Sequence, residues 1–470
     1  MHYSSDTYVL YDLGYMRYPF EYFLLDGRLI STLFCYIGGI LNLPIPTYII
    51  SMDFIGIVFI AISIYMISKI LENIIKPEKN LIKLLLIGAS IILILNQFTL
   101  EYLLFPESAV MCLGVLFNVI AIKIMVGDSK HKYLKIFIAL LIAVFSYQGL
   151  LNMFPMLAIL IYIIKQLKSD EENKIKIKKF FIEMIKLAVI VAIVLGISLV
   201  VINIGKTLLD SNQDRMIHLK DEKSFSIRQE TVMVYMDELW NKTMYMLPEH
   251  INTIIVIGTV VLLFLLKTNK WTIIQYRILV ILTCIMCIGP MFIFNTGVCG
   301  RVNEPITMLW GASLIILLTQ SIHINENKIV KLIYAIIVVS FIINSSFIVQ
   351  NVAEHIASNR VEENMGKAIK YKLDNYEKET GRNVTKFAYV YDKDPKQYAA
   401  GIKPIGSLTE RKLACSWSIL QAMNYYCERK LERVKMPTQV YIDKWIDENY
   451  DQFSEDQVIF ENDTMYFLVY

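Results

Sequence analysis

Five charged side chains stand at short polar turns of a chain that is otherwise apolar. They are the carboxylates Asp6, Glu101 and Glu107 and the arginines Arg28 and Arg301. A carboxylate can accept a proton from an attacking hydroxyl group, and an arginine can hold an anion such as a phosphate through paired hydrogen bonds. These residue types could therefore support a reaction in which a proton is removed and an anion leaves.

Each of these residues also has a purely structural explanation. Asp6 follows two serines and could be a solvated loop residue or part of a helix cap. Glu107 follows Pro106 at an expected helix start, where a carboxylate complements the helix dipole. Arg301 could simply extend its charged end to the membrane surface.

Asp53 is harder to explain structurally, because it lies about two turns inside an apolar run. An ionisable group at that depth is costly and is usually paired or functional. We expect Arg28 or Arg301 to be its partner.

The composition indicates a polytopic membrane protein. Of 470 residues, 55% are hydrophobic and 19% are charged, and the apolar residues form long runs. The net charge of +3 comes with lysines spread over many loops, which does not suggest nucleic-acid binding. The seven cysteines and six histidines show no disulfide framework and no zinc spacing.

We expect about ten membrane spans, although several runs are short. Lysine-rich turns alternate with turns that contain neither lysine nor arginine, and the positive-inside rule assigns the lysine-rich turns to the cytoplasm. The spans are residues 47–68, 84–99, 107–122, 135–147, 150–164, 181–204, 251–266, 276–293, 304–321 and 332–349.

This alternation predicts three regions. Residues 1–46 form an extracytoplasmic first loop with an interfacial helix in "DGRLISTLFCYIGGIL", and residues 47–349 form the transmembrane bundle with an outer loop at 205–250. With no span before it, the first loop either crosses the membrane unaided or follows a first helix that is missing here. We favour the missing helix, with Met1 as an internal start.

Residues 350–470 are expected to form a small extracytoplasmic α/β domain. A long helix ends at Gly381, "KFAYVYD" is a strand, residues 409–434 form one helix that carries both Cys415 and Cys427, and "DQVIFENDTMYFLVY" forms two strands around a turn. The segment has no phosphate loop, nucleophile elbow or metal motif, which favours a supporting or recognition role.

Five motifs in order resemble one family of membrane enzymes. They are "HYSSDTY", "DGRLIS", "FTLEYLLFPES", "SYQGL" and "NTGVCGRVNEP". Their order resembles the integral-membrane glucosyltransferases of the O-antigen-modifying Gtr type (type II), from the start of the chain to about Val349. The resemblance implies a bundle like that of the GT-C class, in the bacterial plasma membrane, with its active site on the extracytoplasmic side.

The resemblance also implies the reaction and the roles of the residues. A hexose, expected to be glucose, moves from a polyprenyl-phosphate donor to a cell-surface glycan. Asp6 would be the catalytic base, and Arg301, with Arg28 as a second candidate, would hold the donor phosphate. Residues that would bind the sugar or the acceptor are Glu101, Glu107, Tyr147, Gln148 and Asn295.

We expect no cofactor and no metal. The family often has adjacent acids in the first loop, whereas Asp6 is followed by Thr7 here, and arginine can hold a monophosphate without a divalent ion. Expected partners are the lipid-linked donor, the glycan acceptor and the bilayer, with a donor synthase and a flippase beside them. A polysaccharide polymerase and a lipid-linked sugar transporter or flippase remain alternatives, and matched inverted repeats, which would favour a transporter, are not evident.

Overall fold

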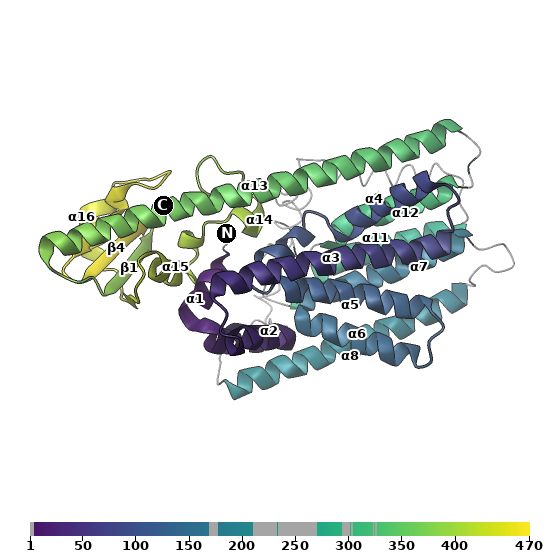
Figure 1. Ribbon diagram of the computed structural model, residues 1–470, viewed down its shortest axis with the longest axis horizontal. Coiled ribbons are helices and arrows are strands. Elements are labelled where there is room, and N and C mark those ends of the chain that lie inside the picture. Colours follow the sequence, from purple (N-terminus) through teal and green to yellow (C-terminus); the bar gives the residue numbers. More distant parts are fainter. Residues whose placement is uncertain are drawn as a thin grey trace.

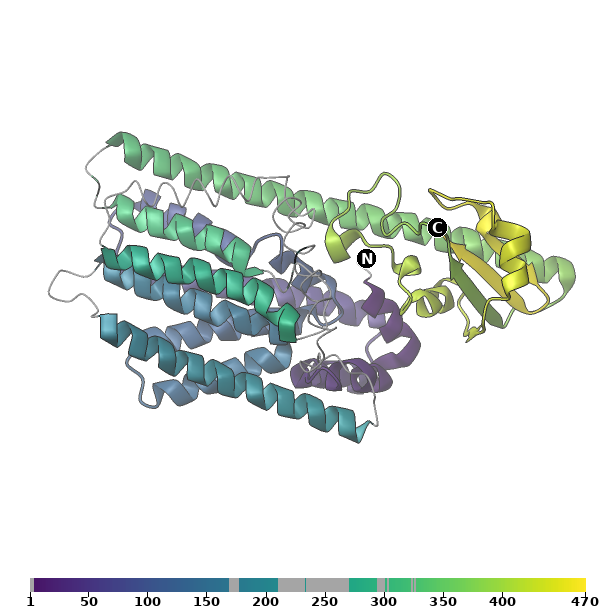
Figure 2. The same cartoon turned by 180° about the vertical axis from the view of Figure 1, so that it is seen from behind.

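A computed structural model describes residues 4–168, 177–209, 270–293, 304–322 and 327–470, together with Met233, Arg301 and Ile324. Long helices run side by side in a bundle, and a small α/β domain extends from one end of it (Figures 1 and 2). The expected outer loop at 205–250 and the expected span at 251–266 lie almost entirely outside the described residues.

The described helices of the bundle correspond to the other expected spans. The runs that were expected on either side of residue 148 form two separate helices, as predicted. The bundle helices are α3 (Ile45–Ile75), α4 (Asn80–Ile94), α5 (Ser108–Val126), α6 (Lys132–Ser146), α7 (Met153–Lys168), α8 (Ile177–Leu208), α11 (Lys270–Ile293), α12 (Glu304–Ser321) and the first part of α13 (Asn327–Thr380).

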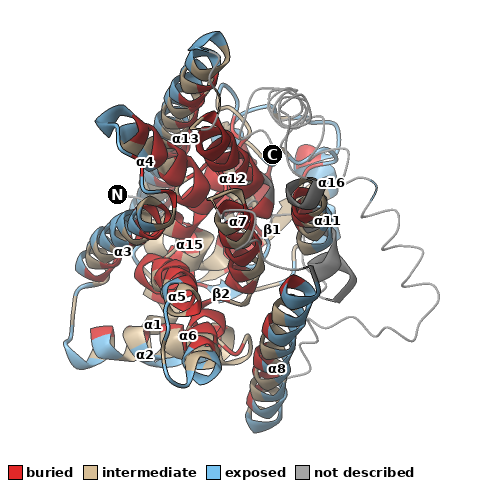
Figure 3. Ribbon diagram, turned by 90° about the vertical axis from the view of Figure 1, so that its right-hand side faces the viewer, coloured by how far each residue is buried: buried red, intermediate tan, exposed pale blue. Residues whose placement is uncertain are grey.

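Apolar side chains fill the bundle and also cover its outside. Buried residues concentrate on α4, α5, α7 and α12, while α3, α8 and α13 turn one face outward (Figure 3). Large apolar side chains such as Phe54, Ile185 and Ile342 are exposed on those outward faces. Five described helices are long and apolar enough to cross a membrane, which fits an outer surface in contact with lipid.

The lysine-rich turns that the structure describes lie at one end of the bundle. The turns between α3 and α4 and between α5 and α6, the end of α7 and the start of α13 are at the right in Figure 1. The N-terminal helices and the α/β domain lie at the opposite end. The bundle therefore has a basic end and an end that carries the polar turns singled out above.

The first segment is helical, where the sequence suggested a polar loop. Helix α1 (Ser5–Tyr18) is started by Ser4, whose backbone N–H donates to the Thr7 hydroxyl at 3.1 Å in a capping box. A short π-helical stretch, Pro19–Leu24, follows it. Helix α2 (Leu29–Ile40) then forms where an interfacial helix was expected, and it exposes Leu33, Ile37 and Ile40.

Helix α13 joins the bundle to the α/β domain without a break. It begins at the basic end and continues for 54 residues, past the whole bundle, to Thr380. It stops at Gly381, as predicted, because this residue has a φ of +69°, which glycine adopts without steric cost. The domain is thus carried on a continuous extension of the last helix of the bundle.

The α/β domain contains a four-stranded sheet with the order β2-β1-β4-β3. Strands β1 (Lys386–Tyr391), β3 (Val458–Glu461) and β4 (Thr464–Val469) form where the sequence predicted them, and β2 (Glu432–Arg433) adds a short edge. β1 is parallel to β2 and β4, whereas β3 is antiparallel to β4. The end of α13 packs on one face of the sheet, and α16 (Thr438–Trp445) packs on the other.

The prediction of one helix over residues 409–434 is wrong. That stretch contains a 3₁₀ turn at Lys412–Ala414, the short helix α15 (Ile419–Tyr426) and strand β2. Cys415 and Cys427 therefore flank a helix instead of sharing one, and both are buried free thiols. The spacing of apolar residues looks helical here, but the segment turns and places its buried residues against two surfaces, α13 and the sheet.

Close packing of α12 against α4 depends on Gly311. A Cβ atom at this position would lie 2.5 Å from the backbone nitrogen of Leu93, and backbone cannot yield as a flexible side chain can. We expect Gly311→Ala to destabilise the protein by about 1–3 kcal/mol. Thermal unfolding in detergent measures the effect.

Gly196→Ala is the matched control, because Gly196 lies within α8 and a Cβ there meets nothing within 4 Å. Alanine favours a helix more than glycine does, so the melting temperature of Gly196→Ala should equal or slightly exceed that of wild type. An equal loss of stability in both variants would contradict the close approach of α4 and α12.

Candidate active site

A tight turn at Asp26, Gly27 and Arg28 presents the first charged groups of the site. The N–H of Arg28 donates to the Phe23 carbonyl at 2.8 Å, and the N–H of Gly27 donates to the Leu24 carbonyl at 3.0 Å. These two bonds, with a φ of +69° at Gly27, form a Schellman motif that ends the preceding helical stretch. The motif directs the chain into α2 with Arg28 at its start.

Arg28 joins two carboxylates and an aromatic ring. Its guanidinium lies 3.3 Å from Asp26 and 3.1 Å from Glu107, the residue just before α5. It also stacks over the ring of Tyr147, with 4.9 Å between the guanidinium carbon and the ring centroid. Because the arginine side chain is only 16% exposed, these partners balance a charge that is largely removed from water.

Arg301 reaches the same tyrosine from a different part of the chain. Its Nε donates to the Tyr147 hydroxyl at 3.1 Å, its backbone N–H donates to Glu101 at 2.9 Å, and its Nη1 lies 3.5 Å from the same carboxylate. The guanidinium also lies over the ring of Phe105 at 4.6 Å. Tyr147 therefore connects the two arginines of the site.

Tyr102 fixes the start of α12 next to Arg301. Its hydroxyl lies 2.6 Å from the Arg301 carbonyl and 2.5 Å from the Glu304 carboxyl group, within hydrogen-bond distance of both. Tyr102 is not among the site residues predicted from the sequence. Its position next to Glu101, in a short turn without lysine or arginine, is the signal that could have identified it.

Gln148 anchors the turn around Arg28. Its side-chain amide donates to the Asp26 carbonyl, and the Ser31 hydroxyl donates to the Ser146 carbonyl at 3.4 Å. The polar segment between α6 and α7 thus holds the start of α2 in place. In the structure Gln148 contacts backbone, so any contact with a sugar remains a proposal.

Asp6 lies at the edge of this cluster. It is in the first turn of α1, half-buried, and its charge contributes to the environments of Glu107 and Tyr18. Glu101 and Glu107 are almost completely buried, with exposed fractions of 0% and 1%. Asp6 is therefore the most accessible of the three acids that the sequence singled out.

Burial is the main cause of an unusual pKa at Glu107. Desolvation, and next the nearby negative charge of Asp6, raise the pKa of Glu107 from 4.5 to about 7, while Arg28 opposes the shift. One of its oxygens, Oε2, is buried and has no hydrogen-bond partner among the described residues. Glu107 can therefore hold a proton near neutral pH or accept a bond from a bound hydroxyl group.

The expected pairing of Asp53 with an arginine is wrong. Asp53 accepts a hydrogen bond of 2.9 Å from the hydroxyl of Ser108, the first residue of α5. Arg28 and Arg301 are instead engaged with acids of the polar turns. Asp53 is half-buried, and a serine partner can satisfy a carboxyl group there without a second charge.

Two parts of the prediction are not tested by these contacts. Asn295 lies outside the described residues. No group of three or more His, Cys, Asp or Glu side chains within the described ranges is arranged to hold a metal ion. That transfer proceeds without a metal or cofactor stays a prediction.

The apolar helices and this charged cluster define the class: a multi-helix membrane protein with a site at the end of the bundle opposite its basic turns. The family model described as glucosyl transferase GtrII matches residues 27–344, more than half of the chain. The chain belongs to that family, which confirms the resemblance found in the motifs. Searches of curated proteins and of solved structures gave no significant match.

The match covers most of the cluster but not all of it. Arg28, Glu101, Glu107, Tyr147 and Arg301 lie inside the matched residues. The first turn of α1, with Asp6, and the α/β domain after residue 344 lie outside them. The contacts that α1 makes with the charged cluster and with the α/β domain are therefore features of this chain that the family match does not describe.

The pKa of Glu107 makes a prediction about stability. Since it is higher in the folded protein than in the unfolded chain, the folded state binds this proton more tightly, and stability falls as the pH rises from about 4.5 to 7. Glu107→Gln removes this loss. We expect the melting temperature of Glu107→Gln, relative to wild type, to be higher at pH 8 than at pH 5.

Thermal unfolding of both proteins in the same detergent across that range measures the difference. A difference that is the same at every pH would show that Glu107 does not titrate abnormally.

Proposed function

We propose that this membrane glucosyltransferase transfers glucose from a polyprenyl-phosphate donor to a cell-surface glycan, at the outer face of the bacterial plasma membrane. The observation that carries the proposal is the cluster of two arginines and several carboxylates around Tyr147. It lies at the end of the bundle opposite the lysine-rich turns, which the positive-inside rule assigns to the cytoplasm. A lipid-linked donor would present its phosphate at this level of the membrane.

In the proposed reaction, an acceptor hydroxyl oxygen attacks C1 of the donor glucose. The bond from C1 to the phosphate oxygen breaks, polyprenyl phosphate leaves, and the hydroxyl proton passes to a carboxylate. Asp6 is the proposed base, because the base must reach a hydroxyl group that enters from outside, and Asp6 is more accessible than Glu101 or Glu107.

Arg301 is the proposed holder of the leaving phosphate. Its side chain is 21% exposed and Arg28 is 16% exposed, so Arg301 has the more open guanidinium. Phosphate gains negative charge as the bond breaks, and a fixed cation stabilises that charge without rearranging. Arg28 is held by two acids and is the second candidate.

The remaining polar groups are proposed to bind hydroxyl groups of the sugars. Glu107 has a buried oxygen with no partner among the described residues, which favours it for this role. Glu101, Tyr147 and Gln148 already contact an arginine or backbone, so they would position the site as well as contact a sugar.

A donor synthase and a flippase are the proposed partners that supply the lipid-linked glucose.

The test is transfer of radiolabelled glucose from polyprenyl-phosphate-glucose to isolated envelope glycan by the purified full-length protein. We expect Asp6→Asn to lower kcat by about 10²–10⁴-fold. We expect Arg301→Ala to lower kcat/KM by about 10²–10³-fold. Melting temperatures close to that of wild type serve as the control for folding.

Three other outcomes would change the conclusion. Activity that survives Asp6→Asn would move the base to Glu101 or Glu107. Movement of labelled lipid across liposomes, without any transfer, would favour a transporter. Polymerisation of the glycan itself would favour a polymerase.

A further inference from the structure

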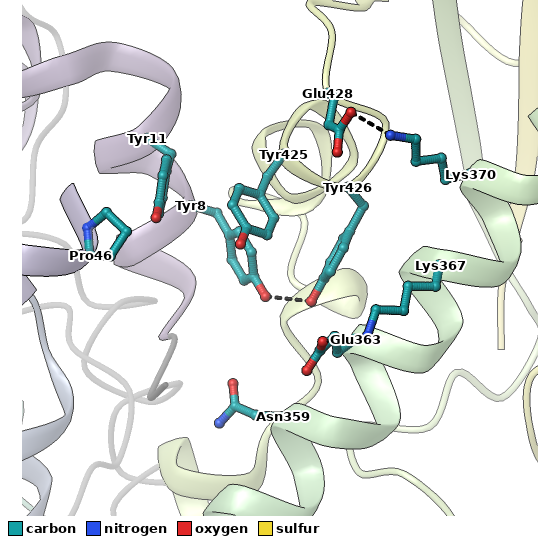
Figure 4. A pocket seen from close by; sticks show the side chains of 10 residues that line it. All are labelled: Tyr8, Tyr11, Pro46, Asn359, Glu363, Lys367, Lys370, Tyr425, Tyr426 and Glu428. Carbon is teal, nitrogen blue, oxygen red and sulfur yellow. Dashed lines mark hydrogen bonds and ion pairs between the residues drawn. The ribbon is translucent and has the colours of Figure 1, made fainter. Parts of the chain in front are cut away.

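A pocket of about 570 Å³ opens where the α/β domain meets the N-terminal helices. Figure 4 shows it between α1, the start of α3, α13 and α15. A volume of this size is typical of sites that bind small molecules. None of the sequence motifs pointed to it, since its walls come from opposite ends of the chain.

One wall of the pocket consists of four tyrosines. Tyr8 and Tyr11 come from α1, and Tyr425 and Tyr426 come from α15. Rings of Tyr11 and Tyr425 lie with their centroids 4.8 Å apart, and the hydroxyls of Tyr8 and Tyr426 are 2.6 Å apart. Aromatic rings offer an apolar face, and their hydroxyls add polar groups at the edge.

The facing wall is polar, and its charges are paired. Glu363 and Lys367, one turn apart on α13, form an ion pair of 2.6 Å, and Lys370 pairs with Glu428. Asn359 adds a side-chain amide on the same helix. Since each charge has an opposite partner, this wall offers both hydrogen-bond donors and acceptors but no net attraction for an ion.

This combination suits a saccharide. A hexose ring has C–H-rich faces that pack on aromatic rings, and a rim of hydroxyl groups that both donate and accept hydrogen bonds. A phosphate would need unpaired cations, and an acyl chain would not use the paired charges opposite the tyrosines.

The pocket and the proposed base share helix α1. Helix α1 carries Asp6 in its first turn and Tyr11 five residues later, an axial separation of about 7.5 Å. The contact between Tyr8 and Tyr426, and a hydrogen bond of 3.0 Å from Asn424 to Asp12, hold α1 against α15. A chain of sugars could therefore occupy the pocket while its next unit lies beside Asp6.

We infer that this pocket binds a saccharide unit of the acceptor glycan, adjacent to the unit that receives glucose. The inference rests on the proposed function, because it assigns the acceptor side of that reaction. The α/β domain thereby gains a role in recognising the acceptor.

The test uses full-length protein, saturating polyprenyl-phosphate-glucose and oligosaccharides released from the envelope glycan of the source cells. Tyr11→Ala and Tyr425→Ala should each raise the KM for the oligosaccharides by about tenfold, with kcat and the donor KM within about twofold of wild type. Tyr11→Phe keeps the ring and should raise this KM less than Tyr11→Ala does. Glu363→Gln, at a 54% exposed side chain, should raise the same KM without endangering the fold.

Tyr371→Ala is the matched control, because Tyr371 is 68% exposed on α13 and does not line the pocket. It should leave the acceptor KM unchanged. Titration of the same oligosaccharides into donor-free protein gives an independent readout, and binding should weaken in the two tyrosine variants and in Glu363→Gln only.

The outcomes separate this inference from the proposed function. If wild type transfers glucose and the acceptor KM is unchanged in Tyr11→Ala, Tyr425→Ala and Glu363→Gln, the pocket does not bind the acceptor. If wild type transfers nothing but binds the oligosaccharides through these residues, the pocket stands and the transfer reaction is wrong. Equal weakening in Tyr371→Ala would also overturn the inference.

Discussion

Two arginines that share one tyrosine are the constraint on which the site depends. Arg28 stacks on the ring of Tyr147, and Arg301 donates to its hydroxyl. A guanidinium stays charged at any physiological pH. Two guanidinium groups that lie close together and mostly out of water must therefore be balanced by nearby acids. Glu101 and Glu107 are two of these acids and both come from the connection between α4 and α5, whereas Arg28, Tyr147 and Arg301 come from three other places in the chain. The ends of several helices must therefore meet at one place, and the apolar bundle behind them holds that place together.

The N-terminal helices extend this constraint beyond the bundle. The Schellman turn at Gly27 aims Arg28 at the cluster, and the Gln148 side chain ties that turn to the segment between α6 and α7. Helix α1 then packs against α15 through Tyr8, whose side chain enters the core of the α/β domain. One short helix thus joins a charged site at the end of the bundle to a separate domain.

Much of the architecture could be predicted, because it follows from local patterns. Apolar runs of membrane length indicated the bundle helices, and the lysine-free turns indicated where the polar groups gather. Gly381 indicated the end of α13, and alternating residues indicated β1, β3 and β4. Local patterns failed over residues 409–434, where burial against two surfaces breaks what looks like a single helix. They also failed for Asp53, whose partner is the nearby Ser108 and not a distant arginine.

The order of amino acids was sufficient to determine the class of protein and which charged residues stand at the polar turns, because hydropathy, lysine placement and glycine conformation act over short stretches of chain. The tertiary structure alone decided which of those charges meet. It placed Arg28 and Arg301 on the same tyrosine, left Asp6 more open than Glu107, and closed a tyrosine-lined pocket from α1 and α15. Each of these depends on segments separated by more than a hundred residues, whose contacts are set by the packing of the whole bundle and not by any local pattern.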